Sequence, residues 1–288
     1  PPVLPDQVIN SEDHGFSDHI EGNCDINNDG FSDLIISNPW ADGTGKVHIC
    51  YGSPAGLNDT DKVVIIPVGT NIQSFGYSVT SSDLNGDGYS DVIAVLSGQL
   101  DTLQVAAYIY NGSAVGISGN YPSSVIAFDF PTYPQNRSIG RLGDLNGDGF
   151  EETAILVNGT RLYVFRGNDS AIFVRTPYRE YLFFDAVEYA SSAGDVNSDL
   201  FDDMLVRTFD ERIIFNGSSE GPGPVPDRKY PSVNCSIYNP LSSAGDFDND
   251  GYDDVVLSDC ESGILYTGSA TGLSAPKAKF LITPHSIT

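Results

Sequence analysis

The sequence predicts an all-β fold, a β-propeller of four-stranded blades, and three repeated features lead to this prediction. A nine-residue acidic pattern occurs five times in the 288 residues. Each copy is followed by an apolar run rich in Val, Ile and Leu, and a second apolar run then leads into a turn. A unit that recurs in register indicates a repeat architecture, and four-stranded sheets repeated around an axis form a propeller.

The acidic pattern sets the period of the repeat. Its copies read DINNDGFSD (25–33), DLNGDGYSD (83–91), DLNGDGFEE (144–152), DVNSDLFDD (195–203) and DFDNDGYDD (246–254). Their first aspartates lie 58, 61, 51 and 51 residues apart. A period near 55 residues has room for four short strands and their turns.

Two apolar runs after each acidic loop predict the two central strands of a blade. The runs that follow the acidic loops are 34–36, 92–95, 154–157, 204–206 and 255–257, and they are too short for helices. The second runs are 47–51, 105–110, 162–165, 213–215 and 264–266. Turns such as YGSPAGL (51–57) and YTGSATGL (266–273) follow, although the third repeat has FRGNDSA instead.

Small residues before the acidic loops predict an inner strand. SVTSSD (78–83) and two copies of SSAGD (191–195 and 242–246) suit a strand crowded against a central axis. Each unit is therefore expected to contain an inner strand, an acidic loop, a buried strand, a third strand, a turn and an outer strand. Both PPVLPDQVIN at the start and APKAKFLIT near the end can serve as outer strands.

Five such units account for the whole chain, so residues 1–288 are expected to form one propeller domain with five blades. The alternative is a ring of six or seven blades in which the remaining blades are degenerate or missing.

The acidic loops have the chemistry of calcium sites. Calcium takes about six to eight oxygen ligands, and oxygens at loop positions 1, 3, 5 and 9 with the carbonyl of position 7 can surround one ion. The predicted side-chain ligands are Asp25, Asn27, Asp29, Asp33, Asp83, Asn85, Asp87, Asp91, Asp144, Asn146, Asp148, Glu152, Asp195, Asn197, Asp199, Asp203, Asp246, Asp248, Asp250 and Asp254. The predicted backbone ligands are Phe31, Tyr89, Phe150, Phe201 and Tyr252.

These loops differ from EF-hands. An EF-hand needs a bidentate glutamate at position 12 and flanking helices, whereas position 12 here is always apolar, as in Ile36 and Ala94. The ions, up to five, are expected to be structural. Loop 195–203 is the exception in which binding is open, because Leu200 stands where the sharp turn calls for glycine.

The segment FGYSVTSSDLNGDGYSDVIAV (75–95) resembles the FG-GAP repeat of integrin α-subunit propellers. The resemblance extends over nearly the whole chain, although only Phe75-Gly76 reproduces the opening dipeptide and the family commonly has seven blades. It implies an extracellular recognition or adhesion module that binds a protein ligand on the face opposite the calcium loops. On that face, loops 38–45 and 67–74 are the expected contacts, with Trp40 as a candidate.

Other functions are less consistent with the sequence. A lectin that binds glycans between blades is the alternative, with Phe16, Phe75, Tyr189 and Tyr238 as a partial aromatic set. An enzyme is not expected, because there is no nucleophile motif, no phosphate loop and no ligand spacing among the four histidines. The net charge of −25 argues against nucleic acid, and no apolar run is long enough to insert into a membrane.

Sequons and cysteines indicate a secreted or cell-surface protein of the eukaryotic secretory pathway. The predicted glycosylation sites are Asn58, Asn111, Asn136, Asn158, Asn168, Asn216 and Asn234. Four cysteines allow two disulfides, with Cys235–Cys260 favoured by hairpin geometry and Cys24–Cys50 less so because one strand separates them. The opening PPVLPD has neither the charged nor the apolar region of a signal peptide, so such a peptide is expected to be absent or already removed.

Overall fold

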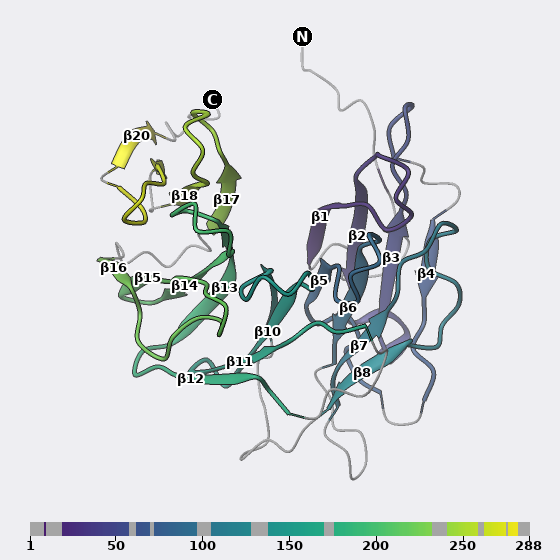
Figure 1. Cartoon of the computed structure of the whole chain (residues 1–288). Coiled ribbons are helices and arrows are strands. Elements are labelled where there is room, and N and C mark those ends of the chain that lie inside the picture. Colours follow the sequence, from purple (N-terminus) through teal and green to yellow (C-terminus); the bar gives the residue numbers. More distant parts are fainter. Residues whose placement is uncertain are drawn as a thin grey trace, which may run out of the picture. The chain divides into compact units, whose positions relative to one another are not determined.

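A computed structural model of the chain describes residues 9, 19–57, 62–69, 72–96, 105–127, 138–169, 176–231, 241–258, 262–274 and 276–281. These residues form five four-stranded antiparallel sheets, and within each sheet the strands follow one another in sequence order (Figure 1). The protein therefore adopts a β-propeller fold with five blades. The described helical structure is one 3₁₀ turn, η1 (Ala41–Gly43), and no described helix is long and apolar enough to cross a membrane.

Two blades lie in the first of two compact units, which comprises residues 1–139 and 165–178. Blade 1 contains β1 (Ile20–Cys24), β2 (Asp33–Asn38), β3 (Lys46–Cys50) and β4 (Val63–Ile65). Blade 2 contains β5 (Val79–Ser82), β6 (Asp91–Val95), β7 (Val105–Tyr110) and β8 (Ser124–Ala127).

The second unit comprises residues 140–164 and 179–288 and contains blades 4 and 5 and all of blade 3 except Ser138, Ile139 and Phe165. Blade 3 contains β9 (Ser138–Gly143), β10 (Glu152–Val157), β11 (Arg161–Phe165) and β12 (Arg179–Leu182). Blade 4 contains β13 (Val187–Gly194), β14 (Asp203–Thr208), β15 (Glu211–Phe215) and β16 (Arg228–Pro231). Blade 5 contains β17 (Leu241–Gly245), β18 (Asp254–Ser258), β19 (Ser262–Tyr266) and β20 (Pro276–Leu281).

The second strand of each blade is largely buried, as its continuous apolar sequence predicts. All five residues of β6 and all six of β10 and β14 are buried. In the first unit, β2 and β3 pack against blade 2 in a cluster that contains Ile35, Ile49 and Phe75. In the second unit, Leu205 and Ile214 of blade 4 pack with Val255 and Leu257 of blade 5. Apolar contact between successive blades thus forms the core of each unit.

The outer strand of the last blade comes from the C-terminal segment, as predicted. β20 pairs with β19 and completes blade 5 from consecutive strands. Blade 1 likewise takes all four strands from residues 20–65. The segment PPVLPDQVIN, the other expected outer strand, lies outside the described residues except for Ile9.

The expectation of a Cys24–Cys50 disulfide is wrong for this structure. Both residues are buried but do not form a bridge. Cys24 lies on β1 and Cys50 on β3, and β2 runs between these strands. Two strand spacings amount to roughly 9.6 Å, beyond the Cα separation of about 7 Å that a disulfide tolerates. Cys235 and Cys260 lie outside the described residues.

Candidate metal centre

Each of the five acidic loops connects the first strand of a blade to its second strand. We number the loops 1 to 5 with their blades and their residues 1 to 9, so loop 1 is 25–33 and loop 5 is 246–254. Strand β2 begins at position 9 of loop 1, and the strands β6, β10, β14 and β18 begin at position 9 of loops 2, 3, 4 and 5. All the side chains predicted as ligands therefore lie at one end of their blade.

The aspartate at position 1 organises the turn of its own loop. Its two carboxylate oxygens accept hydrogen bonds from the backbone N–H groups of positions 5 and 6, over 2.8–3.2 Å in all five loops. The aspartate at position 5 accepts one further bond from the N–H of position 7, at 2.9–3.1 Å. Positions 1 and 5 are thereby held in each loop by the same set of contacts.

Position 3 is asparagine in four loops and brings positions 3 and 5 together. In loops 1, 2 and 4 its Nδ2 donates to the position 5 carboxylate at 2.9–3.0 Å. In loop 3 the longer side chain of Glu152 reaches inward, and Asn146 donates to it at 2.8 Å instead. Loop 5 has Asp248 at this position and lacks the amide donor.

The acid at position 9 is buried, and it links three segments of its blade. Asp33, Asp91, Glu152, Asp203 and Asp254 are all 0–2% exposed. One oxygen of each accepts the N–H of position 2, at 2.7–3.2 Å. In four blades the other oxygen accepts the N–H of the glycine in the turn after the third strand, at 2.8–3.0 Å. In loop 3 that oxygen is the one to which Asn146 donates.

Burial changes the acidity of these groups. It raises the pKa of Asp91 to about 7 and that of Asp203 to about 7, and it also raises the pKa of Asp33. The backbone N–H groups oppose this effect, but neighbouring aspartates of the same loop reinforce it. A cation in the loop would offset both the burial and the repulsion.

Loop 5 brings three carboxylates within the reach of one ion. Single oxygens of Asp246, Asp248 and Asp254 all lie within 4.8 Å of one another. Two ligands on opposite sides of a calcium ion are about 4.6–5.2 Å apart, because each lies about 2.3–2.6 Å from it. The donor set therefore fits calcium in size and in chemistry.

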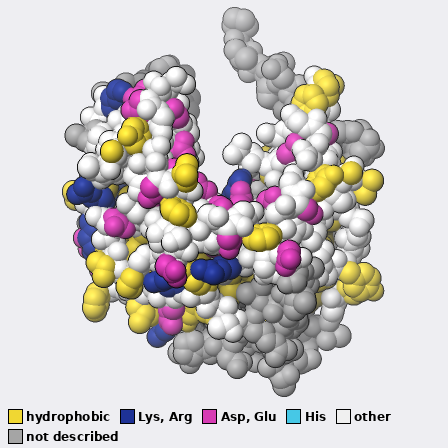
Figure 2. Space-filling model, in the orientation of Figure 1, with side chains coloured by type: hydrophobic (Ala, Val, Ile, Leu, Met, Phe, Trp, Pro, Cys, Tyr) yellow, Lys and Arg dark blue, Asp and Glu magenta, His cyan; other side chains and the backbone are white. Residues whose placement is uncertain are grey.

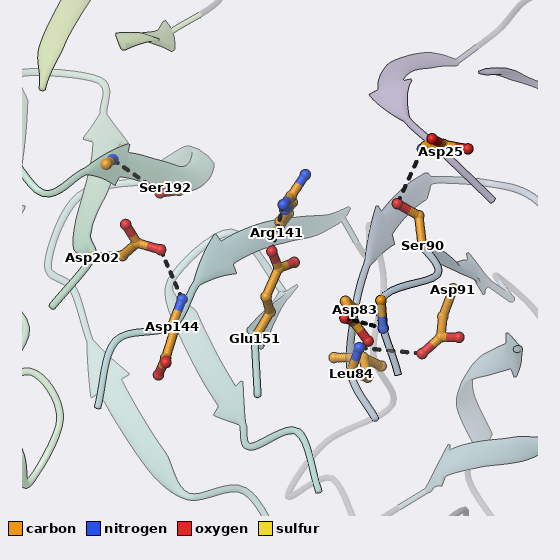
Figure 3. A network of polar contacts seen from close by, with 12 residues as sticks. Asp25, Asp83, Leu84, Ser90, Asp91, Arg141, Asp144, Glu151, Ser192 and Asp202 are labelled. Carbon is orange, nitrogen blue, oxygen red and sulfur yellow. Dashed lines mark hydrogen bonds and ion pairs between the residues drawn. The ribbon is translucent and has the colours of Figure 1, made fainter. Parts of the chain in front are cut away.

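The loops also join successive blades, which the sequence did not predict. Asp25 donates its N–H to Ser90 Oγ of the next loop at 3.2 Å, and its carbonyl accepts the Ser90 N–H at 3.0 Å. Asp144 forms the corresponding pair with Asp202 (Figure 3). Asp195 forms it with Asp253. Position 8 of loops 2, 4 and 5 thus binds the first residue of the preceding loop.

A second contact between blades comes from the turn after the third strand. Ser113, Ser218 and Ser269 donate their N–H to the position 2 carbonyl of the preceding loop at 3.0–3.1 Å. Asn168 makes the same contact with Leu84 at 2.8 Å, so the turn FRGNDSA keeps the interaction without the serine. The contact needs only the backbone N–H, which explains why the third repeat tolerates another sequence.

Leu200 shows how loop 4 keeps its shape without glycine. Its φ is 77°, close to the 85° and 86° of Gly88 and Gly149 at the same position. Its N–H still donates to Asp195 at 2.8 Å, and its side chain is 88% exposed. The loop therefore adopts the strained turn that was predicted, and it retains the contacts of the other four.

The remaining predicted residues are less closely grouped. Trp40 is 57% exposed in the connection between β2 and β3, away from the loops. Among the sequons, Asn158 is exposed in a turn, Asn111 and Asn168 are half-buried, and the Oδ1 of Asn216 is buried. Asn58, Asn136 and Asn234 lie outside the described residues.

Comparison with known proteins agrees with this architecture. A family profile of the FG-GAP repeat matches residues 22–50 and 75–102, which contain loops 1 and 2. The chain is 27% identical to integrin alpha-4 of Xenopus laevis over 187 residues, which cover 63% of this chain and 17% of that protein. It is 35% identical to human integrin alpha-7 over 92 residues, 32% of this chain and 8% of that protein.

One relative is named as an enzyme. Phosphatidylinositol-glycan-specific phospholipase D of Mus musculus is 31% identical over 145 residues, 46% of this chain and 17% of that protein. The matched region thus spans less than a fifth of each of these relatives. The repeated loops, the four-stranded blades and these similarities agree: the chain is a five-bladed β-propeller that contains FG-GAP repeats and is similar to integrin α subunits.

Proposed function

We propose that this protein is an extracellular adhesion or recognition module, a single propeller domain whose loops bind up to five structural calcium ions. The calcium proposal is supported by the recurring carboxylates at positions 1, 5 and 9 and by the three oxygens of loop 5 within 4.8 Å. Calcium bound there would hold the carboxylates and the position 7 carbonyl of one loop together. Because loops 1, 3 and 4 also contact the next blade of their unit, calcium would stabilise those contacts between blades.

The ligand surface is proposed at the opposite ends of the strands. Strand β2 runs from Asp33 in loop 1 to Asn38, so Trp40 lies about 20 Å from the loop at roughly 3.3 Å per residue. In the second unit, Leu182, Phe184 and Phe209 are exposed at the ends of blades 3 and 4 that lie away from the loops. Exposed aromatic side chains at such positions are the anchors that protein interfaces favour.

The exposed Trp40 is the observation on which the choice of a protein ligand depends. It lies next to η1, where Asp42 and Lys46 form an ion pair at 2.8 Å, so an aromatic side chain and charged groups are adjacent. The glycan alternative has less support, because Phe75 of its aromatic set is buried against Tyr108 and Tyr110. Phe16 and Tyr238 of that set lie outside the described residues.

Binding to an array of extracellular proteins tests this proposal. We expect the calcium-loaded chain to bind at least one of them, and Trp40→Ala to weaken that binding at least tenfold, the loss of an interface hot spot. Val115→Ala is the matched control, because Val115 is 82% exposed but lies in the turn near the loops. Equal loss in both variants would contradict the proposed face, and hits on a glycan array alone would favour the lectin. Turnover of a phosphatidylinositol-glycan substrate would instead favour an enzyme.

A further inference from the structure

Loop 5 differs from the other loops in both charge and partner. Position 3 is asparagine in loops 1 to 4, whereas Asp248 gives loop 5 a fourth carboxylate at the predicted ligand positions, beside Asp246, Asp250 and Asp254. Without an amide donor at position 3, the carboxylates of positions 3 and 5 have no bridging N–H between them. Like charges this close repel each other, so the loop requires another positive group.

Lys277 supplies that group from the outer strand of the same blade. Its Nζ forms an ion pair with Asp248 Oδ2, and its side chain is 54% exposed while that of Asp248 is 20% exposed. The other oxygen, Asp248 Oδ1, is buried and accepts no hydrogen bond within the described part of the chain. One oxygen of Asp248 therefore holds the lysine, and the other has capacity for a further cation.

A bulge in β20 directs Lys277 toward the loop. Ala278 pairs with Leu265 and Pro276 pairs with Tyr266, so Lys277 is an extra residue between two adjacent pairs. A bulged residue is released from the regular alternation of a strand and its side chain is re-aimed. Lys279, two residues further along, stays in register opposite Ile264.

We propose that Lys277 is a tethered counter-cation that occupies the fourth carboxylate of loop 5 and lowers the affinity of this loop for calcium. The proposal rests on calcium binding by the loops. With the lysine in place, the ligand positions of loop 5 have the same net charge as those of an asparagine-containing loop, and calcium must share or displace the ammonium group to use Asp248. Removal of the lysine leaves four carboxylates for one ion.

Terbium(III), which binds calcium sites, provides a readout that is selective for this loop. Terbium emission is sensitised by a tyrosine close to the ion, and tyrosine occupies position 7 only in loops 2 and 5, as Tyr89 and Tyr252. In a Tyr89→Phe background of the full chain, the part of the sensitised emission that a further Tyr252→Phe substitution removes therefore reports loop 5. Competition with calcium then gives the calcium affinity of the same loop.

We expect Lys277→Gln to raise the affinity of loop 5 for calcium by roughly twofold to fivefold, the range of a partly exposed ion pair. Lys279→Gln is the matched control, since it removes the same charge from the same strand without the contact to Asp248. In an Asp248→Asn background, Lys277→Gln should have no more effect than the control. Higher salt should narrow the difference between wild type and Lys277→Gln, because exposed charges are screened.

The possible outcomes separate this inference from the proposal on which it depends. If the wild type binds terbium and calcium at loop 5 but Lys277→Gln behaves like Lys279→Gln, the role of Lys277 is overturned and the calcium proposal stands. If neither ion binds at loop 5, both are overturned for this loop. An equal gain in calcium affinity from Lys277→Gln in the wild-type and Asp248→Asn backgrounds would also overturn the role of the Lys277–Asp248 ion pair, since it would show a long-range charge effect.

Discussion

At the scale of single residues, position 6 of the loops shows what the repeat requires of its sequence. The turn needs a positive φ, which costs a residue with a Cβ about 1–2 kcal/mol. Four loops meet this need with glycine, and the fourth loop has Leu200 at φ 77°. The native contacts of loop 4 are intact, so the strain remains in the folded state and its removal should be measurable.

Leu200→Gly is expected to stabilise the protein. The variant relieves the left-handed strain but gives the unfolded chain more freedom, which costs about 0.5–1 kcal/mol. The expected net gain in the free energy of unfolding is therefore about 0.5–1 kcal/mol, measured by urea denaturation in calcium. Val115→Gly is the control, because Val115 is similarly exposed and does not have a positive φ. Val115→Gly should destabilise, and a loss of stability in Leu200→Gly would show that the backbone is not strained there.

At the scale of the secondary-structure elements, the turn after the third strand holds one blade against the loop of the preceding blade. A Cβ at Gly112 would lie 2.6 Å from the carbonyl oxygen of Ser90 and 2.7 Å from that of Ile26. Gly217 and Gly268 meet the corresponding backbone atoms of their own neighbours. The glycine is thus required by the close approach of two backbones, while the residue after it supplies the N–H that joins the blades.

Gly112→Ala should therefore loosen blade 2 from loop 1. The Ile26 carbonyl cannot move without breaking its hydrogen bond from the Ser113 N–H. We therefore expect a loss of about 1–3 kcal/mol in the free energy of unfolding, as in overpacked cores. Gly223→Ala is the matched control, since a Cβ there would have its nearest contact at 3.8 Å. Urea denaturation of both variants at the same calcium concentration measures the difference. Equal stabilities would contradict the requirement for close packing.

Much of each blade could be predicted from the sequence because its signals are local. The apolar runs at 92–95 and 204–206 correspond to β6 and β14, and the shared turn positions correspond to the loops that join strands. Leu200 was also interpreted correctly, since the conformation of a tight turn depends mainly on its own residues.

The contacts between blades could not be predicted in the same way, since they join residues far apart in the chain. Ser90 and Asp25 are 65 residues apart, and Asp202 and Asp144 are 58 apart. One signal was present, because position 8 is always Ser, Asp or Glu. The expected Cys24–Cys50 bridge failed for a related reason, since sequence pattern places both residues near one end of a blade but does not measure the distance across β2.

At the scale of the whole molecule, the distribution of charge connects folding to calcium. The formal net charge is −25, and Figure 2 shows acidic side chains exposed on the described part of each unit. Five calcium ions would carry ten positive charges and move the net charge to −15. The carboxylates of one loop repel each other when no cation is bound, so removal of calcium should weaken all the loops at once.

Chelation of calcium is accordingly expected to lower the melting temperature, and by more at high pH than at low pH. When the free calcium concentration is about 100 times the dissociation constant of a site, binding at that site adds about 2.7 kcal/mol to the free energy of unfolding. Burial raises the pKa of Asp91 and Asp203 to about 7, above the ordinary value of 3.8. Without calcium, the folded state binds more protons than the unfolded state between these values, so the stability from these groups is present at low pH and is lost as pH rises toward 7. Calcium replaces those protons, so its stabilising effect should grow over the same range.

Calorimetry with calcium or with EDTA at pH 5.5 and 7.5 measures the size of this effect, and magnesium at the same concentration tests selectivity. A melting temperature that EDTA leaves unchanged at both pH values would contradict the proposal that the loops bind calcium, and a calcium effect that is larger at pH 5.5 would contradict the role of the buried carboxylates.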